Sequence, residues 1–306
     1  MQIAVLLTCH NRRALTVGCL ETLSAQRLPP HTELTVYLVD DGCTDGTAAA
    51  VSKRFPETRI VPGDGSLYWC GGMRLAWQSA AAASDYDGYL WLNDDVSLFP
   101  AALSTLLSCS RRAAAAGRPG IIVGTTCDPD DGGRPTYGGR RGKSVLGPSG
   151  EMQPCETMNG NIVLVPRAVF SKVGSLSPDF RQMFGDFDYG FRARKAGFEI
   201  WAAPGFLGEC RENPCPPWAD PSVPFVRRWR AVHGPKGYPP RENYIFSRRH
   251  YGWRGLVRLL KIYLRVLFPG LWDWLFRLLE KRSSSGCPPF RLTGGGGGGK
   301  VGYGTE

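Results

Sequence analysis

Short apolar runs alternate with segments of helical periodicity along the first part of the chain. The apolar runs predict strands over residues 3–7, 34–39, 59–61, 89–92 and 121–125. Between them, apolar residues recur at helical spacing and predict helices over residues 12–26, 45–55, 71–84 and 101–116. Thr44 is the expected N-cap of the second of these helices. The alternation predicts an α/β fold with a mainly parallel central sheet and helices on both faces.

The pattern becomes less regular in the middle of the chain. Asp, Gly, Pro and Arg dominate residues 126–158, which predicts a loop or an irregular hairpin. Apolar runs then predict strands over residues 159–165 and 198–201, and helical spacing predicts helices over residues 167–173 and 184–196.

Pro-rich and basic segments fill the rest of the chain. Residues 211–240 contain eight Pro, which predicts an extended connection or a mobile loop. Residues 243–282 are basic, aromatic and helical in pattern, and residues 283–306 form a Gly/Ser-rich tail that we expect to be disordered. We therefore expect a main domain over residues 1–220, a Pro-rich connection with basic helices over residues 221–282, and the tail.

The net charge of +10 is distributed unevenly. Residues 1–226 hold 21 Lys and Arg against 23 Asp and Glu, a net of −2, whereas residues 227–306 hold 16 against 4, a net of +12. A basic end on a slightly acidic body argues against a protein whose whole surface binds nucleic acid, so no nucleic-acid partner is expected. The distribution favours contact between the basic end and an anionic membrane surface.

The basic end contains two amphipathic segments. In residues 255–268, Arg258, Lys261 and Arg265 fall on one helical face, and apolar residues cover the rest. A Pro-Gly pair separates this segment from a second one over residues 271–282. A cationic stripe beside a broad apolar face predicts peripheral membrane association through an in-plane helix pair. The alternative is a helix packed on the main domain or in a dimer interface, and the sequence gives no signal for an oligomeric state.

The predicted compartment follows from the apolar segments and the cysteines. No run of 18 uncharged apolar residues is present, and the apolar opening Ile3–Leu7 is too short for the core of a signal peptide. The ten cysteines contain no C-x-x-C pair, so reduced thiols in a cytoplasmic protein are expected. Cys210 and Cys215 are expected to be free thiols, with a disulfide or a metal site as the alternatives.

Polar clusters follow three of the predicted strands: Thr8–Asn11, Asp40–Asp41 and Asn93–Asp95. Ligands bind beyond the carboxyl ends of the strands in such sheets, so the clusters are expected to share one site. The adjacent carboxylates of Asp94 and Asp95 repel each other unless a cation is close, and a divalent cation with a diphosphate is the usual partner. The alternative is a turn that caps a helix.

Several motifs occur in the order and spacing of a known enzyme family. They are TCHNR (8–12), VDDGCTDGT (39–47), LNDDV (92–96) and GDFDYGFRARKAGFEIW (185–201). Together they resemble the inverting family 2 glycosyltransferases, which have the GT-A fold. SLYWCGGMRLAW (66–77) and NGNIVLVPRAVFSKVG (159–174) are similar to the bacterial branch that includes rhamnosyltransferases and galactofuranosyltransferases. The resemblance covers about residues 2–210 and implies a GT-A catalytic domain over residues 1–220.

The resemblance implies a nucleotide-sugar site at the strand ends. Thr8 would lie near the nucleotide base. Asp41, supported by Asp40, would hydrogen-bond the base or the ribose. Gly71 and Gly72 would let the backbone approach the nucleotide or the sugar closely.

The resemblance also implies a metal site after the fourth strand. Asp95 would bind a Mg²⁺ or Mn²⁺ that bridges the diphosphate, and Asp94 would lean toward the ribose or the sugar. Asn93 stands where the family has Asp, which removes one negative charge. His233 lies in the Pro-rich connection, where some relatives place a further metal ligand, and a solvated loop histidine is the alternative.

Asp186 matches the general base of the family. It would take the proton from the acceptor hydroxyl while the nucleoside diphosphate leaves from the opposite face, which inverts the anomeric centre. The family usually has Glu-Asp where this chain has Gly185-Asp186. Asp188 lies two residues further along the same helix, so only one of the two side chains is expected to face the site. The match to the family motif implies that Asp186 is the base. The alternative for both is that acidic side chains favour a helix N-terminus.

Two tryptophans are candidates for a sugar subsite, because aromatic faces stack on the C–H groups of sugars. They are Trp69 and Trp77. Trp77 lies at helical spacing, so core packing is its alternative role.

The predicted function is an inverting glycosyltransferase of polysaccharide biosynthesis in the bacterial cell envelope. It would move a sugar from a UDP- or dTDP-sugar to a hydroxyl of a lipid-linked or cell-surface glycan, at the inner face of the cell membrane. One alternative is a sugar-nucleotide pyrophosphorylase, which the missing Gly-rich signature after the first strand disfavours. Another is a non-catalytic nucleotide- or polyanion-binding protein. A Rossmann dehydrogenase is excluded because G-x-G-x-x-G does not follow the first strand.

Overall fold

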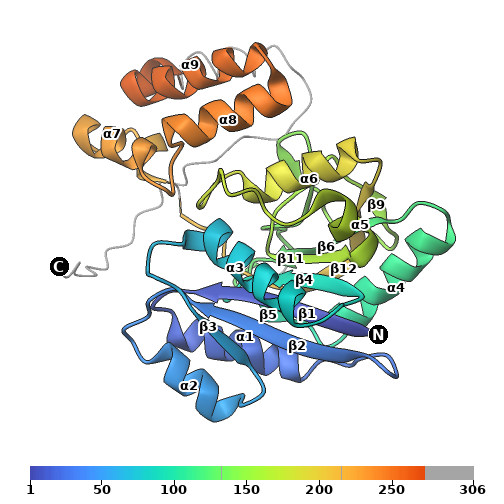
Figure 1. The fold of residues 1–306 in the computed structure, drawn as a ribbon. Coiled ribbons are helices and arrows are strands. Elements are labelled where there is room, and N and C mark those ends of the chain that lie inside the picture. The colour runs from blue at the N-terminus through green and yellow to red at the C-terminus, as the bar shows by residue number, and fades with distance from the viewer. Residues whose placement is uncertain (132, 215, 273–306) are drawn as a thin grey trace.

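One large β-sheet forms the centre of the protein (Figure 1). The structure is a computed structural model that describes residues 1–131, 133–214 and 216–272. The strands of the sheet are β1 (Gln2–Cys9), β2 (Glu33–Asp40), β3 (Arg59–Pro62), β4 (Gly88–Leu92), β5 (Ser97–Leu98), β6 (Gly120–Cys127), β9 (Gln153–Pro154), β11 (Ile162–Pro166) and β12 (Glu199–Glu209). Their order is β3-β2-β1-β4-β11-β6-β12-β5, and β9 pairs with β12 outside this path.

The direction of the strands explains how distant segments meet at one edge. β1 pairs in parallel with β2 and β4, β2 with β3, and β6 with β12. β11 runs antiparallel to both of its neighbours, β4 and β6. The residues just before β11 therefore meet those just after β4, and the Asn93 N–H donates to the Asn161 carbonyl at 3.0 Å. The predicted α/β fold with a mainly parallel sheet is confirmed.

Helices cover both faces of the sheet because the side chains of a strand point alternately to its two faces. Ile3, Val5 and Leu7 of β1 pack in one core, whereas Ala4 and Leu6 pack in the other. The first core contains residues of α1 and α4, and the second contains residues of α3, α5 and α6. The bounds of the helices in this part of the chain are α1 (Arg13–Ser24), α2 (Thr47–Arg54), α3 (Tyr68–Ala83), α4 (Ala102–Ala115), α5 (Arg167–Val173) and α6 (Gly185–Lys195).

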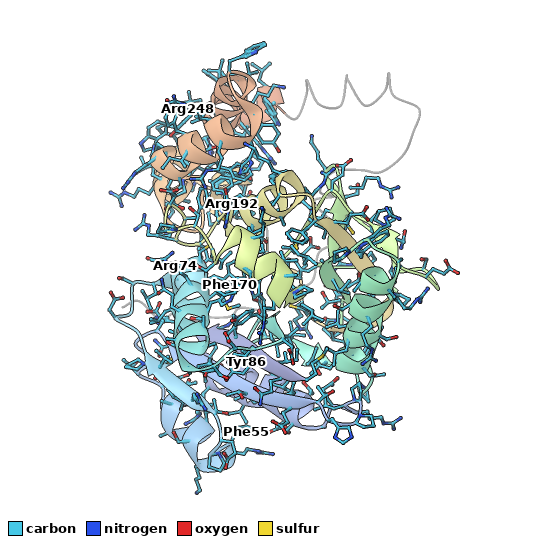
Figure 2. The ribbon with its side chains drawn as sticks, turned by 45° about the vertical axis from the view of Figure 1, so that its right-hand side comes forward. Phe55, Arg74, Tyr86, Phe170, Arg192 and Arg248 are labelled. Atoms are coloured by element: carbon cyan, nitrogen blue, oxygen red, sulfur yellow. The ribbon has the colours of Figure 1, made fainter. Side chains whose placement is uncertain are left out.

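The second core is rich in aromatic rings. Trp77 of α3 is fully buried, and its ring lies 5.5 Å from that of Trp91 and 5.4 Å from that of Tyr189. Phe170, labelled in Figure 2, stacks on Trp77 at 5.2 Å between ring centroids. Core packing is thus the observed role of Trp77, and its candidacy for a sugar subsite was wrong.

The N-cap predicted for the second helix was also wrong. α2 begins at Thr47, and Gly46 occupies the N-cap position with a left-handed backbone (φ 80°). The Asp45 carboxylate accepts hydrogen bonds from the N–H (3.1 Å) and the hydroxyl (2.5 Å) of Thr47. Thr44 donates its N–H to the side chain of Asn11 instead, at 2.7 Å. The loop after β2 is therefore tied to the loop after β1.

The irregular middle segment contains a second, small sheet of order β10-β7-β8. Its strands are β7 (Gly139–Arg141), β8 (Ser144–Val145) and β10 (Thr157–Met158). β7 and β8 pair antiparallel, which confirms the predicted hairpin. The Pro-rich segment 211–240 differs from the prediction, because it contains a 3₁₀ turn, η1 (Pro217–Ala219), and the helix α7 (Phe225–His233). α7 starts directly after Pro224, a position where proline costs no helical hydrogen bond.

Three C-terminal helices form a separate layer beside α6 (Figure 1). They are α7, α8 (Pro240–Tyr251) and α9 (Arg254–Leu267). The Arg228 side chain of α7 donates to the Val266 carbonyl of α9 at 3.2 Å. Phe246 of α8 stacks on Phe184, just before α6, with ring centroids 4.6 Å apart. The predicted boundary at residue 220 stays a prediction, and the tail 283–306 and most of the second amphipathic segment lie outside the described residues.

None of the helices in the described ranges is both long and apolar enough to span a bilayer.

The polar face of α9 differs in part from the predicted cationic stripe. Lys261 is exposed, but the guanidinium of Arg265 lies over the ring of Trp218 at 5.5 Å and is half-buried. The side chain of Arg258 lies outside those described.

The contact between α8 and α6 predicts a test of the C-terminal layer. Phe246 is 1% exposed, whereas Tyr244 on the same helix is 44% exposed. Phe246→Ala should lower the free energy of unfolding by about 3–5 kcal/mol, because it leaves a cavity among stacked rings. Tyr244→Ala, the matched control, should change it by less than about 1 kcal/mol. Urea denaturation measures both, and equal values for the two variants would contradict the packing described.

Candidate active site

Asp41 organises the loop that leads from β3 to α3. Its carboxylate is buried and accepts hydrogen bonds from the N–H groups of Gly65 at 2.8 Å and Tyr68 at 3.0 Å. Its carbonyl oxygen lies 2.6 Å from Nδ1 of His10. The carboxylate therefore has a structural role at the end of β2, and its predicted contact with the base or ribose stays a prediction.

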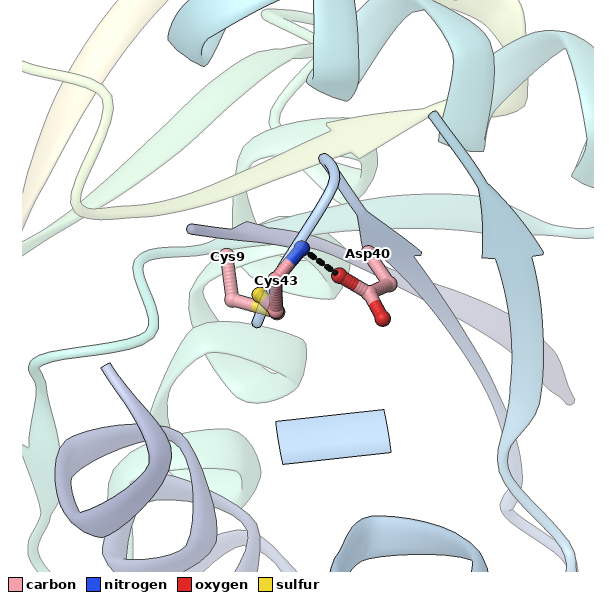
Figure 3. Close-up of side chains that lie close together, drawn as sticks. All are labelled: Cys9, Asp40 and Cys43. Carbon is pink, nitrogen blue, oxygen red and sulfur yellow. Dashed lines mark hydrogen bonds between the residues drawn. The ribbon is translucent and has the colours of Figure 1, made fainter. Parts of the chain in front are cut away.

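Asp40 lies beside two thiols at the ends of β1 and β2 (Figure 3). Its Oδ1 accepts a hydrogen bond from the Cys43 N–H at 2.8 Å, and the sulfur atoms of Cys9 and Cys43 are 3.8 Å apart. Burial, followed by the interaction with the Cys43 thiol, raises the pKa of the Cys9 thiol far above its ordinary value. Sulfur ligands suit soft metals, whereas Mg²⁺ and Mn²⁺ take oxygen ligands. This cluster is therefore distinct from the predicted metal site.

The glycines at the start of α3 allow close packing within the protein. A Cβ on Gly72 would lie 2.1 Å from the hydroxyl oxygen of Thr8 at the end of β1. A Cβ on Gly71 would lie 3.2 Å from the Cβ of Leu67. The close approach at Gly72 is thus between α3 and β1, a role that the sequence alone did not indicate. The predicted contacts of Thr8, Gly71 and Gly72 with a nucleotide stay predictions.

Arg12 bridges the two carboxylates that follow β4. Its Nη1 donates to Asp94 Oδ1 at 2.7 Å, and its Nη2 donates to Asp95 Oδ2 at 2.7 Å. The Thr16 hydroxyl donates to the other Asp94 oxygen at 3.3 Å, and the Cys210 thiol faces the other Asp95 oxygen at 3.6 Å. A guanidinium therefore supplies positive charge between the two carboxylates, and the expected divalent cation stays a prediction.

The donor set after β4 fits a divalent cation. Asp94 and Asp95 offer hard carboxylate oxygens, the ligands that Mg²⁺ and Mn²⁺ prefer, and the Arg12 guanidinium bonds only one oxygen of each. The side chain of Asp95 is 18% exposed, against 6% for Asp94, so Asp95 is the more accessible ligand. Burial raises the pKa of Asp94 to about 6, although the charge of Arg12 opposes this shift.

Asp186 lies at the start of α6, half-buried. Its Oδ2 accepts a hydrogen bond from the Gly160 N–H at 3.2 Å, and its Oδ1 accepts one from the Phe187 N–H at 2.8 Å. Burial raises the pKa of Asp186 to about 6, although these backbone donors and the charge of Arg140 lower it. A carboxylate with such a pKa is well suited to accept a proton near neutral pH.

Trp69 lies between Asp186 and the segment Asn93–Asp95, which contains the predicted metal ligand Asp95. Its indole N–H donates to Asn93 Oδ1 at 2.7 Å. A Cβ on Gly160 would come within 2.4 Å of the Trp69 ring and 3.5 Å of the Asp186 Cβ, so these three residues are in close contact. Asn93, the departure from the family's acidic motif, thus holds an aromatic ring rather than an extra charge.

Asp188 has a different environment on the same helix. Its carboxylate is fully buried and accepts hydrogen bonds from Arg192 (2.8 Å) and Arg249 (2.7 Å), with His250 Nε2 also at 2.8 Å. Burial alone would raise the pKa of Asp188, but hydrogen bonds from His250 and Arg249 and the charge of Arg192 lower it overall. These contacts hold α8 against α6, which assigns Asp188 a structural role and leaves Asp186 as the candidate base.

His233 is engaged within the C-terminal layer. Its Nδ1 lies 2.6 Å from the Trp229 carbonyl oxygen and its Nε2 lies 3.4 Å from the Tyr263 hydroxyl. Its ring also packs against both aromatic rings, at 4.5 Å and 5.7 Å. His233 therefore sits in a helix rather than a solvated loop, and its predicted role as a metal ligand stays a prediction that these contacts do not favour.

Some residues of the site carry more than the sequence showed. Arg12, which belongs to the motif TCHNR, was not assigned a role from the sequence. A basic residue at one strand end and two carboxylates, Asp94 and Asp95, at another could have indicated their ion pair. Trp69 was a candidate for a sugar subsite. Its hydrogen bond to Asn93 could not be predicted from the sequence, because only the fold brings the two residues together. Cys210 is a free, buried thiol as predicted, and Cys215 lies outside the described residues.

Comparison with known proteins identifies the class to which this fold and site belong. Residues 4–154 match the model of Glycosyl transferase family 2. Among solved structures, Staphylococcus aureus TarS 1–349 in complex with UDP-GlcNAc aligns with a TM-score of 0.51 and 12% identity, over 83% of this chain and 73% of that one. The mannosyltransferase PcManGT from Pyrobaculum calidifontis, in complex with GDP-Man and Mn²⁺, aligns with a TM-score of 0.52 and 14% identity, over 94% of this chain and 76% of that one. The protein therefore has the GT-A fold that these solved glycosyltransferase structures share.

A comparison with curated sequences finds a relative with a named activity. The chain is 28% identical over 208 residues to an N-acetylglucosaminyl-diphospho-decaprenol L-rhamnosyltransferase of Mycobacterium tuberculosis (strain CDC 1551 / Oshkosh). That match covers 58% of this chain and 66% of the relative, slightly less than two thirds of its length. The resemblance to family 2 glycosyltransferases with the GT-A fold is thus confirmed.

The contrast between Asp188 and Asp179 predicts a stability test. Asp188→Asn should lower the free energy of unfolding by about 3–5 kcal/mol. It removes the only buried carboxylate that pairs with Arg192 and Arg249 among the described residues. Asp179→Asn, whose carboxylate also pairs with Arg249 but is 31% exposed, should cost less than about 1 kcal/mol. Denaturation curves at pH 7 measure both.

The pH dependence gives a second check on Asp188. Because its pKa is lowered in the folded protein, its contribution is present above its unfolded pKa and is lost as the pH falls through the folded value. The difference in stability between wild type and Asp188→Asn should therefore shrink on acidification. A difference that stays constant from pH 7 to pH 3 would contradict the assignment.

Proposed function

We propose that the protein is an inverting glycosyltransferase that moves a sugar from a UDP- or dTDP-sugar to a hydroxyl of a lipid-linked glycan acceptor. The observation that carries the proposal is the contact chain Asn93–Trp69–Gly160–Asp186. These contacts join the segment Asn93–Asp95 after β4 to the Asp186 carboxylate, whose pKa is raised to about 6. A transferase of this kind needs a donor site and a base on opposite sides of one sugar.

The proposed reaction is a single displacement. Asp186 accepts the proton of the acceptor hydroxyl as its oxygen attacks the anomeric carbon. The bond between that carbon and the diphosphate oxygen breaks at the same time, and the bonding electrons leave with the nucleoside diphosphate. The Gly160 and Phe187 N–H groups hold the Asp186 carboxylate in place, since they occupy one lone pair on each oxygen.

Charge on the leaving diphosphate needs a partner at the end of β4. Asp95 would hold a Mg²⁺ or Mn²⁺, which when bound supplies positive charge to the diphosphate oxygens. Asp94, whose two oxygens face Arg12 and Thr16, would keep Arg12 in reach of the same site. Among the solved structures with this fold, PcManGT contains Mn²⁺, which supports this type of cofactor.

The sequence relative supports the choice of sugar and acceptor. Its name states transfer of L-rhamnose to N-acetylglucosaminyl-diphospho-decaprenol. We therefore propose L-rhamnose as the sugar and a polyprenyl-diphosphate-linked glycan as the acceptor. Cell-envelope polysaccharide biosynthesis follows from that acceptor, as does a location at the inner face of the membrane.

Asp186→Asn should abolish transfer while donor binding remains. Loss of a general base lowers kcat by roughly 10²–10⁴-fold. Donor binding is measured as the thermal shift produced by UDP- and dTDP-sugars with Mn²⁺, since stabilisation follows affinity. Asp95→Ala should lose the Mn²⁺-dependent part of that shift. Wild-type turnover in both variants would rule out the proposed mechanism.

The raised pKa of Asp186 predicts the acid limb of the rate profile. The ionised form acts as the base, so kcat should be level above pH 6 and fall about tenfold for each pH unit below it. Asp94 also has a pKa of about 6, so the profile is repeated for Asp94→Asn at saturating donor. The limb persists in that variant if Asp186 causes it, and its disappearance would assign it to Asp94.

The exposed face of the C-terminal layer supports a peripheral membrane location. Large apolar side chains, each between 40% and 59% exposed, follow one side of α9 and the residues after it: Val257, Leu260, Leu264, Leu267, Phe268 and Leu271. Trp229 of α7 lies beside this row through its ring contact with Tyr263 at 5.7 Å. Residues 221–272 contain eleven Lys and Arg and a single acidic residue, Glu242, which is 5% exposed. An apolar row within a basic surface fits an anionic lipid bilayer.

Vesicle sedimentation tests this location. The protein should bind vesicles that contain phosphatidylglycerol, and less so at high salt, since the attraction is partly electrostatic. Leu260→Asp with Leu264→Asp should reduce the bound fraction by about tenfold or more, because charges replace the apolar contact. The control is Leu15→Asp on α1, at a site of similar exposure (48%). Equal binding of the double variant and the wild type would contradict the proposal.

A further inference from the structure

We infer that Arg12 is a tethered counter-ion that competes with the divalent cation for Asp95 and yields that position when a nucleoside diphosphate enters. The inference rests on the proposed function, which assigns Asp95 to the metal. It concerns regulation of that site: free protein would bind the divalent cation poorly, and the nucleotide would make the cation bind tightly.

The contacts of Arg12 show why it competes. One guanidinium bonds both carboxylates at 2.7 Å, so it carries the only positive charge that the described residues place in hydrogen-bonding contact with this pair. A divalent cation at Asp95 would face this positive charge at close range, which disfavours its binding while Arg12 remains there. Removal of Arg12 without a replacement would leave two adjacent carboxylates with little solvent, which also costs free energy.

The backbone of Arg12 is fixed, so the side chain is the part free to move. The Arg12 carbonyl accepts hydrogen bonds from the Thr16 N–H at 2.9 Å and the Thr16 hydroxyl at 3.1 Å. Asn11 has a left-handed backbone (φ 51°), and its side chain accepts the Thr44 N–H at 2.7 Å. The Arg12 side chain is 39% exposed, whereas that of Asp94 is 6% exposed. The guanidinium can therefore turn toward solvent or a ligand while its attachment point stays in place.

A diphosphate supplies the new partner for the displaced guanidinium. Arginine binds phosphate oxygens through two parallel hydrogen bonds, so a diphosphate at the strand ends can accept Arg12 as the carboxylates accept the divalent cation. After this exchange, the guanidinium pairs with the diphosphate and the carboxylates pair with the divalent cation, so none of these charges is left without a partner. It links the two ligands thermodynamically: the nucleotide raises the affinity for the cation, and the cation raises the affinity for the nucleotide by the same factor.

The decisive experiment measures Mn²⁺ binding to the free protein by electron paramagnetic resonance of unbound Mn²⁺. Arg12→Gln should bind Mn²⁺ alone about tenfold or more tightly than wild type, and added UDP or dTDP should enhance that binding less than in wild type. A merely structural arginine would give weaker Mn²⁺ binding, or none, when removed. The neighbouring exposed residue gives the matched control, since Arg13→Gln removes the same charge and should behave as wild type.

Further variants separate this inference from the proposed function. Arg12→Lys keeps the charge but loses the planar fork that spans both carboxylates, so its Mn²⁺ affinity should lie between those of wild type and Arg12→Gln; this variant also serves if Arg12→Gln fails to fold by circular dichroism. Asp95→Asn in the Arg12→Gln background should abolish Mn²⁺ binding. If it does not, the proposed metal site is wrong. If it does, but Arg12→Gln binds Mn²⁺ no more tightly than wild type, the site stands and the counter-ion role is overturned.

Discussion

Desolvation of carboxylates is the constraint on which the carboxyl edge of the central sheet depends, because a buried anion is costly unless hydrogen bonds or cations compensate it. Each aspartate at this edge meets that constraint differently. Asp41 uses backbone N–H groups, Asp188 uses basic side chains of two helices, and the Asp94–Asp95 pair shares one arginine. Burial raises the pKa of Asp186 to about 6, because its backbone donors and the charge of Arg140 offset the burial only in part. Burial raises the pKa of Asp94 to about 6 as well, but that carboxylate is bonded to Arg12. Asp186 is therefore the better placed of the two to exchange a proton.

The sequence indicated the residue types of this site better than their partners. Strand ends in a parallel sheet converge by geometry alone, so the strand pattern was sufficient to predict that the clusters around Asp41 and Asp95 lie at one edge. Hydrogen-bond partners depend on loop paths that no periodicity encodes. Arg12 lies 82 residues before Asp94 and reaches it only because β1 and β4 are neighbours in the sheet.

The fold shows the same division. Apolar periodicity predicted the alternating strands and helices, because inner strands such as β4 bury both faces and each helix buries one. It did not give α7, because the density of proline around Phe225–His233 suggested an extended chain. Proline lies before the helix and after it, where it limits a helix rather than breaking it. Nor did periodicity reveal that Gly72 serves contact between α3 and Thr8, since that need arises only when helix and strand cross.

Asp186, the proposed base, lies between the sheet and the C-terminal layer, which connects the proposed chemistry with the proposed membrane location. Phe184, two residues before Asp186, has a left-handed backbone (φ 72°) and stacks on Phe246 of α8. Asp188, two residues after Asp186, pairs with Arg249 of α8. An acceptor sugar attached to a lipid through a diphosphate has little freedom in its height above the bilayer. An enzyme for such an acceptor therefore needs its base at a fixed distance from its membrane-facing surface, and the two attachments that flank Asp186 supply that rigidity through α8 to α9.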